Sequence, residues 1–102
     1  MSDRLKLHEE LVSVLGSRNV YFQPPESVKI KYPCIIYERD SADIKFANDK
    51  PYKNVFRYTV TVIEKDPDGL FIEKLLGHFH MCRYDRHYTA DNLNHDVFTL
   101  YY

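Results

Sequence analysis

The segment from His78 to His87 holds the densest group of side chains in the sequence that could bind a metal ion. His78, His80 and Cys82 would share one face if this segment were a strand, and Zn²⁺ accepts imidazole and thiolate ligands. The pattern is weak, because the segment straddles an expected helix end and no second ligand pair completes a site. Partly exposed histidines beside a core strand are the simpler interpretation, and we expect no metal or other cofactor.

Catalytic motifs are equally sparse. The sequence has no Gly-x-Ser-x-Gly motif, and neither Cys34 nor Cys82 stands in a recognisable catalytic context. The three glycines are too far apart to form a phosphate-binding loop. Carboxylate pairs occur in turn-like segments, where Asp is favoured for backbone reasons. We therefore expect a protein that is not an enzyme, with both cysteines as free core thiols in a reducing compartment.

Charged and aromatic side chains alternate after position 82. Arg83 and Arg86 stand beside Tyr84 and Tyr88, a mixture that can stack on nucleic acid. However, 14 basic and 15 acidic residues leave a net charge of -1, which excludes binding to nucleic acid through overall charge alone. Mixed charges that include Tyr and Arg are more typical of a protein–protein interface. The pattern therefore favours such an interface over a specific nucleic-acid site.

The elements that would position these side chains follow from hydrophobic spacing. One helix is predicted over residues 2–15, closed by Gly16, and another over 70–79. The apolar stripe of the first helix would consist of Leu5, His8, Leu11, Val12 and Leu15. Strands are predicted at 20–22, 32–39, 54–65, 81–88 and 97–102. With 102 residues and no linker or repeat, this order predicts a single α+β domain (1–102), with two helices flanking a mostly antiparallel sheet of four to five strands.

Two polar segments interrupt this pattern and are predicted as loops, at residues 40–53 and 89–96. The first is long for so small a domain, and connections above about 12 residues without structure are usually functional or disordered. Because it contains the isolated aromatic residues Phe46 and Tyr52, it is interpreted as a loop that docks on a partner. A hairpin tip without a partner is the alternative.

The sequence also bears on location. No apolar run approaches the roughly 20 residues of a membrane-spanning helix. The first residues lack the apolar core of a signal peptide, so synthesis in a cytosol is expected.

Several stretches together resemble the tail-completion or tail-terminator proteins of long-tailed bacteriophages and their prophage relatives. They are Tyr-Pro-Cys-Ile-Ile-Tyr-Glu-Arg at 32–39, the segment 43–52, and the stretches 57–63, 81–88 and 89–98. The resemblance covers most of the chain, from the first helix to the last strand. It depends on the number and order of ordinary residues rather than on a catalytic signature.

This resemblance implies an α+β structural protein of the virion, without catalytic residues or an obligate cofactor. Such proteins form a ring, usually hexameric, that caps the tail tube and joins it to the neck. The implied partners are further copies of the chain, the tail-tube protein and a neck or head-completion protein, with no membrane and no specific nucleic acid, although DNA could pass through the ring. The implied location is the virion tail or neck, after assembly in the bacterial cytoplasm. A head-closure or adaptor protein of the neck and a small monomeric binding module are the alternatives.

The candidate interface residues combine this resemblance with the charge pattern. In the family, a long loop or hairpin between central strands contacts other subunits or the tube, and residues 40–53 match it. Arg83 and Arg86 on one edge could pair with Asp91 and Asp96 on another to close the ring. The residues predicted for the subunit or tail-tube interface are Arg39, Asp43, Phe46, Lys50, Tyr52, Arg83, Asp85, Arg86, Asp91 and Asp96.

Overall fold

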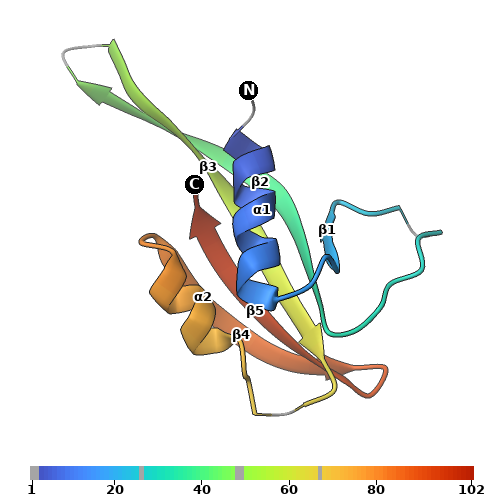
Figure 1. Cartoon of the computed structure of the whole chain (residues 1–102). Helices are drawn as coiled ribbons and strands as arrows, with labels where there is room; N and C mark the ends of the chain where they lie inside the picture. Colours follow the sequence, from blue (N-terminus) through green and yellow to red (C-terminus); the bar gives the residue numbers. More distant parts are fainter. Residues whose placement is uncertain (1–2, 26, 48–49, 67) are drawn as a thin grey trace.

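The computed structural model of the chain describes residues 3–25, 27–47, 50–66 and 68–102, with side chains described outside residues 3 and 41–55. Along the chain, one helix precedes three strands and a second helix precedes two more strands (Figure 1). They are α1 (Asp3–Leu15), β1 (Val20–Phe22), β2 (Cys34–Ala47), β3 (Lys50–Glu64), α2 (Ile72–His78), β4 (Cys82–Ala90) and β5 (Leu93–Tyr101). This arrangement confirms the predicted α+β class.

The strands form one sheet in the order β1-β2-β3-β5-β4. The short β1 pairs with β2 in parallel, whereas the β2–β3, β3–β5 and β5–β4 pairings are antiparallel. β4 therefore lies at one edge of the sheet, and β1 with the outer part of β2 lies at the other. The sheet is mostly antiparallel, as predicted.

The core forms between one face of this sheet and both helices (Figure 1). On that face, Val60 of β3 is paired with Tyr37 of β2 and with Phe98 of β5, and all three side chains are almost completely buried. Helix α1 contributes Leu7, Leu11, Val14 and Leu15, and Leu75 of α2 and Phe79 just after it complete the cluster. Because side chains alternate along a strand, the residues between these core positions lie on the opposite face. Neither α1 nor α2 covers that opposite face, which is called the open face below.

The buried stripe of α1 differs from the predicted one. Leu7 and Leu11 are fully buried, whereas Leu5 is 52% exposed. His8 is half-buried and its Nδ1 lies 2.7 Å from the Tyr37 hydroxyl. Both sets of residues have helical spacing, so only packing against the sheet decides between the two faces. The helix does end at the expected glycine, since Gly16 has a φ of 80° and its N–H donates to the Val12 carbonyl at 2.8 Å.

The prediction of a loop at residues 40–53 was wrong. This segment forms the outer parts of β2 and β3, which remain paired as far as Ala47 and Lys50. β1 pairs with β2 only up to Tyr37, and β5 pairs with β3 only from Arg57. The described strands at 40–47 and 50–55 therefore form a two-stranded projection, called the arm below. Apolar alternation in a sequence indicates a strand that packs one face on a core, whereas backbone pairing between two strands does not require such a pattern.

The arm gives the molecule an elongated shape, with principal extents of 50 × 27 × 22 Å (Figure 1). The radius of gyration is 14.5 Å, against about 13 Å for a compact domain of this length. A bulge between Arg39 and Ser41 lies at the base of the arm. Bulges bend a strand and increase its twist, so the arm begins where β2 changes direction.

The second predicted loop, at 89–96, was also wrong. β4 continues to Ala90 and β5 begins at Leu93, so only Asp91 and Asn92 lie between them. Both have left-handed backbones, with φ of 54° and 62°. This is the conformation that a type I′ hairpin turn requires at its two central residues, and Asp and Asn tolerate it. The neighbouring polar residues belong to the strands themselves.

Candidate subunit interface

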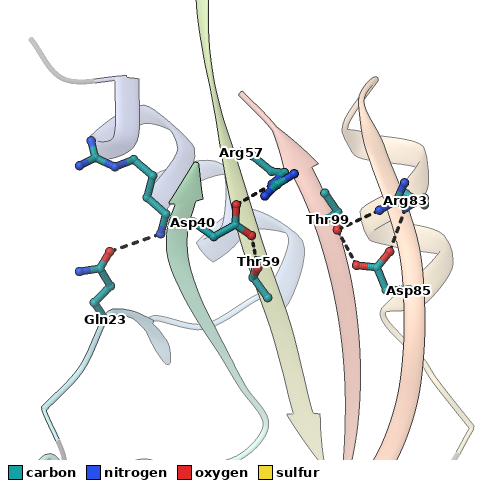
Figure 2. A network of polar contacts seen from close by, with 8 residues as sticks. Gln23, Asp40, Arg57, Thr59, Arg83, Asp85 and Thr99 are labelled. Atoms are coloured by element: carbon teal, nitrogen blue, oxygen red, sulfur yellow. Dashed lines mark hydrogen bonds and ion pairs between the residues drawn. The ribbon is translucent and has the colours of Figure 1, made fainter. Parts of the chain in front are cut away.

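A row of polar side chains crosses the open face of the sheet (Figure 2). At one end is Asp40, the residue in the bulge of β2. Its Oδ1 accepts a hydrogen bond from Arg57 Nε at 2.6 Å, and its Oδ2 accepts one from the Thr59 hydroxyl at 2.7 Å. Both donors lie on β3, so the carboxylate joins the bulge of β2 to its neighbour at the base of the arm.

The same arrangement is repeated on the other half of the sheet (Figure 2). Asp85 Oδ1 accepts a hydrogen bond from Arg83 Nε at 2.9 Å, and Asp85 Oδ2 accepts one from the Thr99 hydroxyl at 2.5 Å. Thr99 lies directly opposite Thr59 in the pairing of β5 with β3. The two units therefore form one continuous row, in which two Asp–Arg pairs surround two central threonines.

The electrostatics of this row keep both carboxylates charged at neutral pH. Hydrogen bonds from Arg57 and Thr59 lower the pKa of Asp40. Burial by itself would raise the pKa of Asp85, but hydrogen bonds from Thr99 and Arg83 outweigh it, so the pKa of Asp85 is also lowered. Two carboxylates and two guanidinium groups cancel in charge. The row is thus a prearranged surface of fixed donors and acceptors without net charge, which suits register-specific contact with another protein.

A bulge in β4 brings further charge to this face. Strict alternation would place Arg83 and Arg86 on opposite faces, but the register shift between Tyr84 and Arg86 aligns Arg86 with Val97. Arg83 is aligned with Thr99, two positions further along the same face of β5. Both arginines therefore lie on the open face. The sequence prediction assigned both arginines to one interface, and in the structure it is the bulge that puts them on one surface.

Aromatic side chains extend this surface at the β4 edge. Tyr88 is 40% exposed and stacks on His95, with ring centres 4.6 Å apart. The guanidinium carbon of Arg86 lies 5.7 Å from the Tyr88 ring centre. From Arg83 to Ala90, β4 is exposed along its length. Exposed Tyr and Arg on an edge strand are the residue types that anchor protein interfaces.

The remaining predicted interface residues are separated in space. Arg39 lies at the base of the arm, with its guanidinium carbon 5.1 Å from the Phe56 ring centre. Asp91 is exposed in the β4–β5 turn. Asp96 is only 3% exposed and lies on the helix-covered face, where it accepts a hydrogen bond from the Tyr84 hydroxyl at 2.9 Å. Asp96 therefore does not belong to an accessible charged edge in this chain.

Four further predicted residues, Asp43, Phe46, Lys50 and Tyr52, have side chains outside the described part of the chain, although their backbones lie in the arm. Sequence reasoning missed four members of the polar row: Asp40, Arg57, Thr59 and Thr99. In the sequence, Thr59 stands between the core residues Tyr58 and Val60, and this alternation did indicate a polar face opposite the core. No sequence signal indicated that Asp40 sits in a bulge.

The metal-like cluster of the sequence does not form a site. Within the described ranges no group of three or more His, Cys, Asp or Glu residues could hold a metal ion. His78 Nε2 instead lies 3.0 Å from Glu10 on α1. Cys34 and Cys82 are free thiols, and burial raises their pKa to about 12 and about 11 respectively. Among the helices described, none has the length and apolar character needed to span a bilayer.

Comparisons with known proteins assign no family to this fold. No family model matches the chain, and neither curated proteins nor solved structures produced a match. The candidate interface is therefore defined by its own geometry: the arm, the polar row on the open face, and the exposed β4 edge.

Proposed function

We propose that this chain is a non-enzymatic assembly protein of the bacteriophage tail-terminator type. In this proposal it forms a ring at the head-proximal end of a tail tube, stops polymerisation of the tube, and provides the surface that joins the tail to the neck. The observation that carries the proposal is the two-stranded arm. The resemblance in sequence supplies the identity of the assembly, and the arm supplies a physical reason for a partner.

The arm is poorly supported within a single chain. A two-stranded hairpin without a third strand or a packed face is at best marginally stable in water. In the described structure, β2 and β3 have only each other as strand partners beyond Asp40 and Phe56. The sequence of this segment nevertheless includes the apolar residues Ile44, Phe46 and Tyr52. A neighbouring subunit or the tube would provide such a segment with a further strand or an apolar surface.

The position of the arm suits a ring rather than a two-fold dimer. The arm extends from β2 and β3, whereas the exposed strand β4 lies at the opposite edge of the sheet. A contact between the arm of one copy and the β4 side of the next uses two different surfaces, which makes it a heterologous interface. Heterologous contacts that close on themselves generate rings. The neutral row of Asp and Arg pairs beside β4 would set the register of such a contact.

The test compares the full-length chain with an arm-shortened variant. In the variant, Asn-Gly replaces residues 44–54 and connects Asp43 to Val55, which are register partners across the hairpin. We expect light scattering coupled to size exclusion to give a ring-sized mass for the full-length chain, either alone or mixed with the tail-tube protein of the same phage. We expect the shortened variant to remain a monomer. Its thermal unfolding should change little, because the variant keeps every residue of the described core cluster.

A matched control changes charge outside the arm. Lys29→Gln removes an exposed charge in the connection between β1 and β2, away from both the arm and β4, and it should leave ring formation intact. Equal ring formation by the arm-shortened variant would contradict the role of the arm. A full-length chain that stays monomeric with and without the tube protein would contradict the terminator function. Binding to a head-side neck protein alone would then favour a head-closure or adaptor component.

A further inference from the structure

A second candidate site lies away from the polar row, at the end of β3. A pocket of about 330 Å³ opens between the start of β2, the end of β3 and the chain leading into α2. Its lining is apolar and aromatic except for carboxylates and one lysine. The side chains used below are Tyr32, Pro33, Glu64, Asp66, Leu70 and Phe71.

Glu64 is the unusual member of this lining. It is only 3% exposed, and its Oε1 has no hydrogen-bond partner among the described residues. The backbone N–H of Leu70 donates to its carboxylate, which satisfies only part of its capacity. Buried polar atoms in proteins nearly always have a partner, so an unpaired carboxylate oxygen in a pocket lining requires an explanation.

The charges around Glu64 are mostly of the same sign. Burial raises its pKa, and Asp66, Asp96 and Asp68 raise it further, against the lowering effect of the Leu70 N–H. Asp66 accepts a hydrogen bond from the backbone N–H of Asp68, and Asp96 accepts one from Tyr84. Lys65 also lines the pocket, but it forms no ion pair with the described carboxylates. The pocket therefore has a surplus of negative charge and one carboxylate oxygen that could accept a donor.

We propose that this pocket binds a lysine side chain of a protein partner, with the ammonium group on the Glu64 carboxylate and the alkyl stem against Tyr32, Pro33 and Phe71. A lysine stem packs well on apolar surface while its charged end seeks an acceptor. Aromatic walls add attraction for a cation. The exposed side chains of Leu70 and Tyr32, at 55% and 41%, provide apolar surface around the pocket for the rest of the partner.

Entry of the ammonium group requires a small local movement, because Glu64 Oε1 is sealed from water. Leu70 lines the pocket and is 55% exposed, so a change of its rotamer is the movement that we infer. Once seated, the ammonium group would supply the missing donor and offset the repulsion from the neighbouring carboxylates. This site does not depend on the proposed ring.

The test uses the full-length chain labelled with ¹⁵N and, as probe, Nα-acetyl-lysine methylamide at pH 7. The backbone amides of Leu70 and Phe71 report directly, since the Leu70 N–H donates to the Glu64 carboxylate. We expect saturable shifts with a Kd on the order of 1 mM, as for a ligand of this size. The Nε-acetylated analogue, which has no charge, should bind at least about tenfold more weakly.

Two variants and a control complete the experiment. Glu64→Gln keeps the shape but removes the charge, and it should lose the saturable shifts. Tyr32→Ser changes an exposed wall of the pocket without affecting the core, and it should weaken binding several-fold. Glu38→Gln removes an exposed carboxylate of β2 at the register position of Thr59, five residues along β3 from Glu64, and this variant should bind as the unchanged chain does. Equal binding of the acetylated analogue, undiminished binding by a folded Glu64→Gln variant, or no saturable shifts in the unchanged chain would each overturn the proposal.

Discussion

Thr99→Val tests whether the polar row of the open face is a structural unit. The Thr99 hydroxyl donates to Asp85 Oδ2 at 2.5 Å and lies 3.5 Å from Arg83 Nη2. Thr99 is 8% exposed, and valine has nearly the same shape. The substitution therefore removes the hydroxyl contacts with little change in packing.

The magnitude follows from what Asp85 retains. A hydrogen bond to a charged group contributes about 1.5–3 kcal/mol to stability. In the variant Asp85 would still accept from Arg83 Nε at 2.9 Å, and its side chain is 25% exposed, so water would replace part of the lost contact. We therefore expect Thr99→Val to lower the free energy of unfolding by about 1–2 kcal/mol at pH 7. This corresponds to a fall in Tm of about 4–8 °C for each kcal/mol in a domain of this size.

The sign of the pH dependence provides a second check. The pKa of Asp85 in the folded chain lies below its ordinary value of 3.8. A lowered folded-state pKa gives stability that is present above the unfolded pKa and is lost as the pH falls through the folded one. The Thr99 hydroxyl contributes to that lowering, so the stability difference between the variant and the unchanged chain should shrink as the pH falls below about 4.

The assay is urea unfolding at pH 7 and at pH 3, with the m-values compared to confirm that the folded state is unchanged. Thr61→Val is the matched control, because Thr61 lies on the same face of β3 as Thr59 but is not a member of the polar row. Its effect on the free energy of unfolding should stay within about 0.5 kcal/mol. A loss below about 0.5 kcal/mol for Thr99→Val at pH 7, or an equal loss at both pH values, would refute the reasoning.

Two further predictions concern the turn and the thiols. Asn92→Ala should lower the free energy of unfolding by about 1 kcal/mol in urea titrations, because alanine pays a steric penalty at a φ of 62°, whereas Asn92→Gly should be nearly neutral. Cys34 and Cys82 should react with Ellman's reagent far more slowly in the folded chain at pH 7.5 than in urea, because their pKa values of about 12 and about 11 leave little thiolate. Fast reaction of both in the folded chain would contradict the placement of Cys34 in the core and of Cys82 as a partly buried residue.

Much of the fold was predictable from local pattern. Apolar spacing placed both helices and the parts of the strands that pack on the core, and Gly16 marked the end of α1. These features are predictable because burial against a core imposes a period on the side chains themselves. The same pattern left open which face of α1 is buried, since Leu5 and Leu7 begin two stripes of similar spacing.

The candidate interface was predictable only in part. The sequence alone determined its composition: a near-neutral mixture of Arg, Asp and Tyr after position 82, and a polar segment with isolated aromatics at 40–53. The tertiary structure decided that this segment is an arm, that Arg83 and Arg86 share a face, and that Asp96 is buried. The arm depends on backbone hydrogen bonds between strands, and the shared face depends on a bulge that shifts the register by one residue. Neither leaves a period in the side chains, so neither could be read from the sequence.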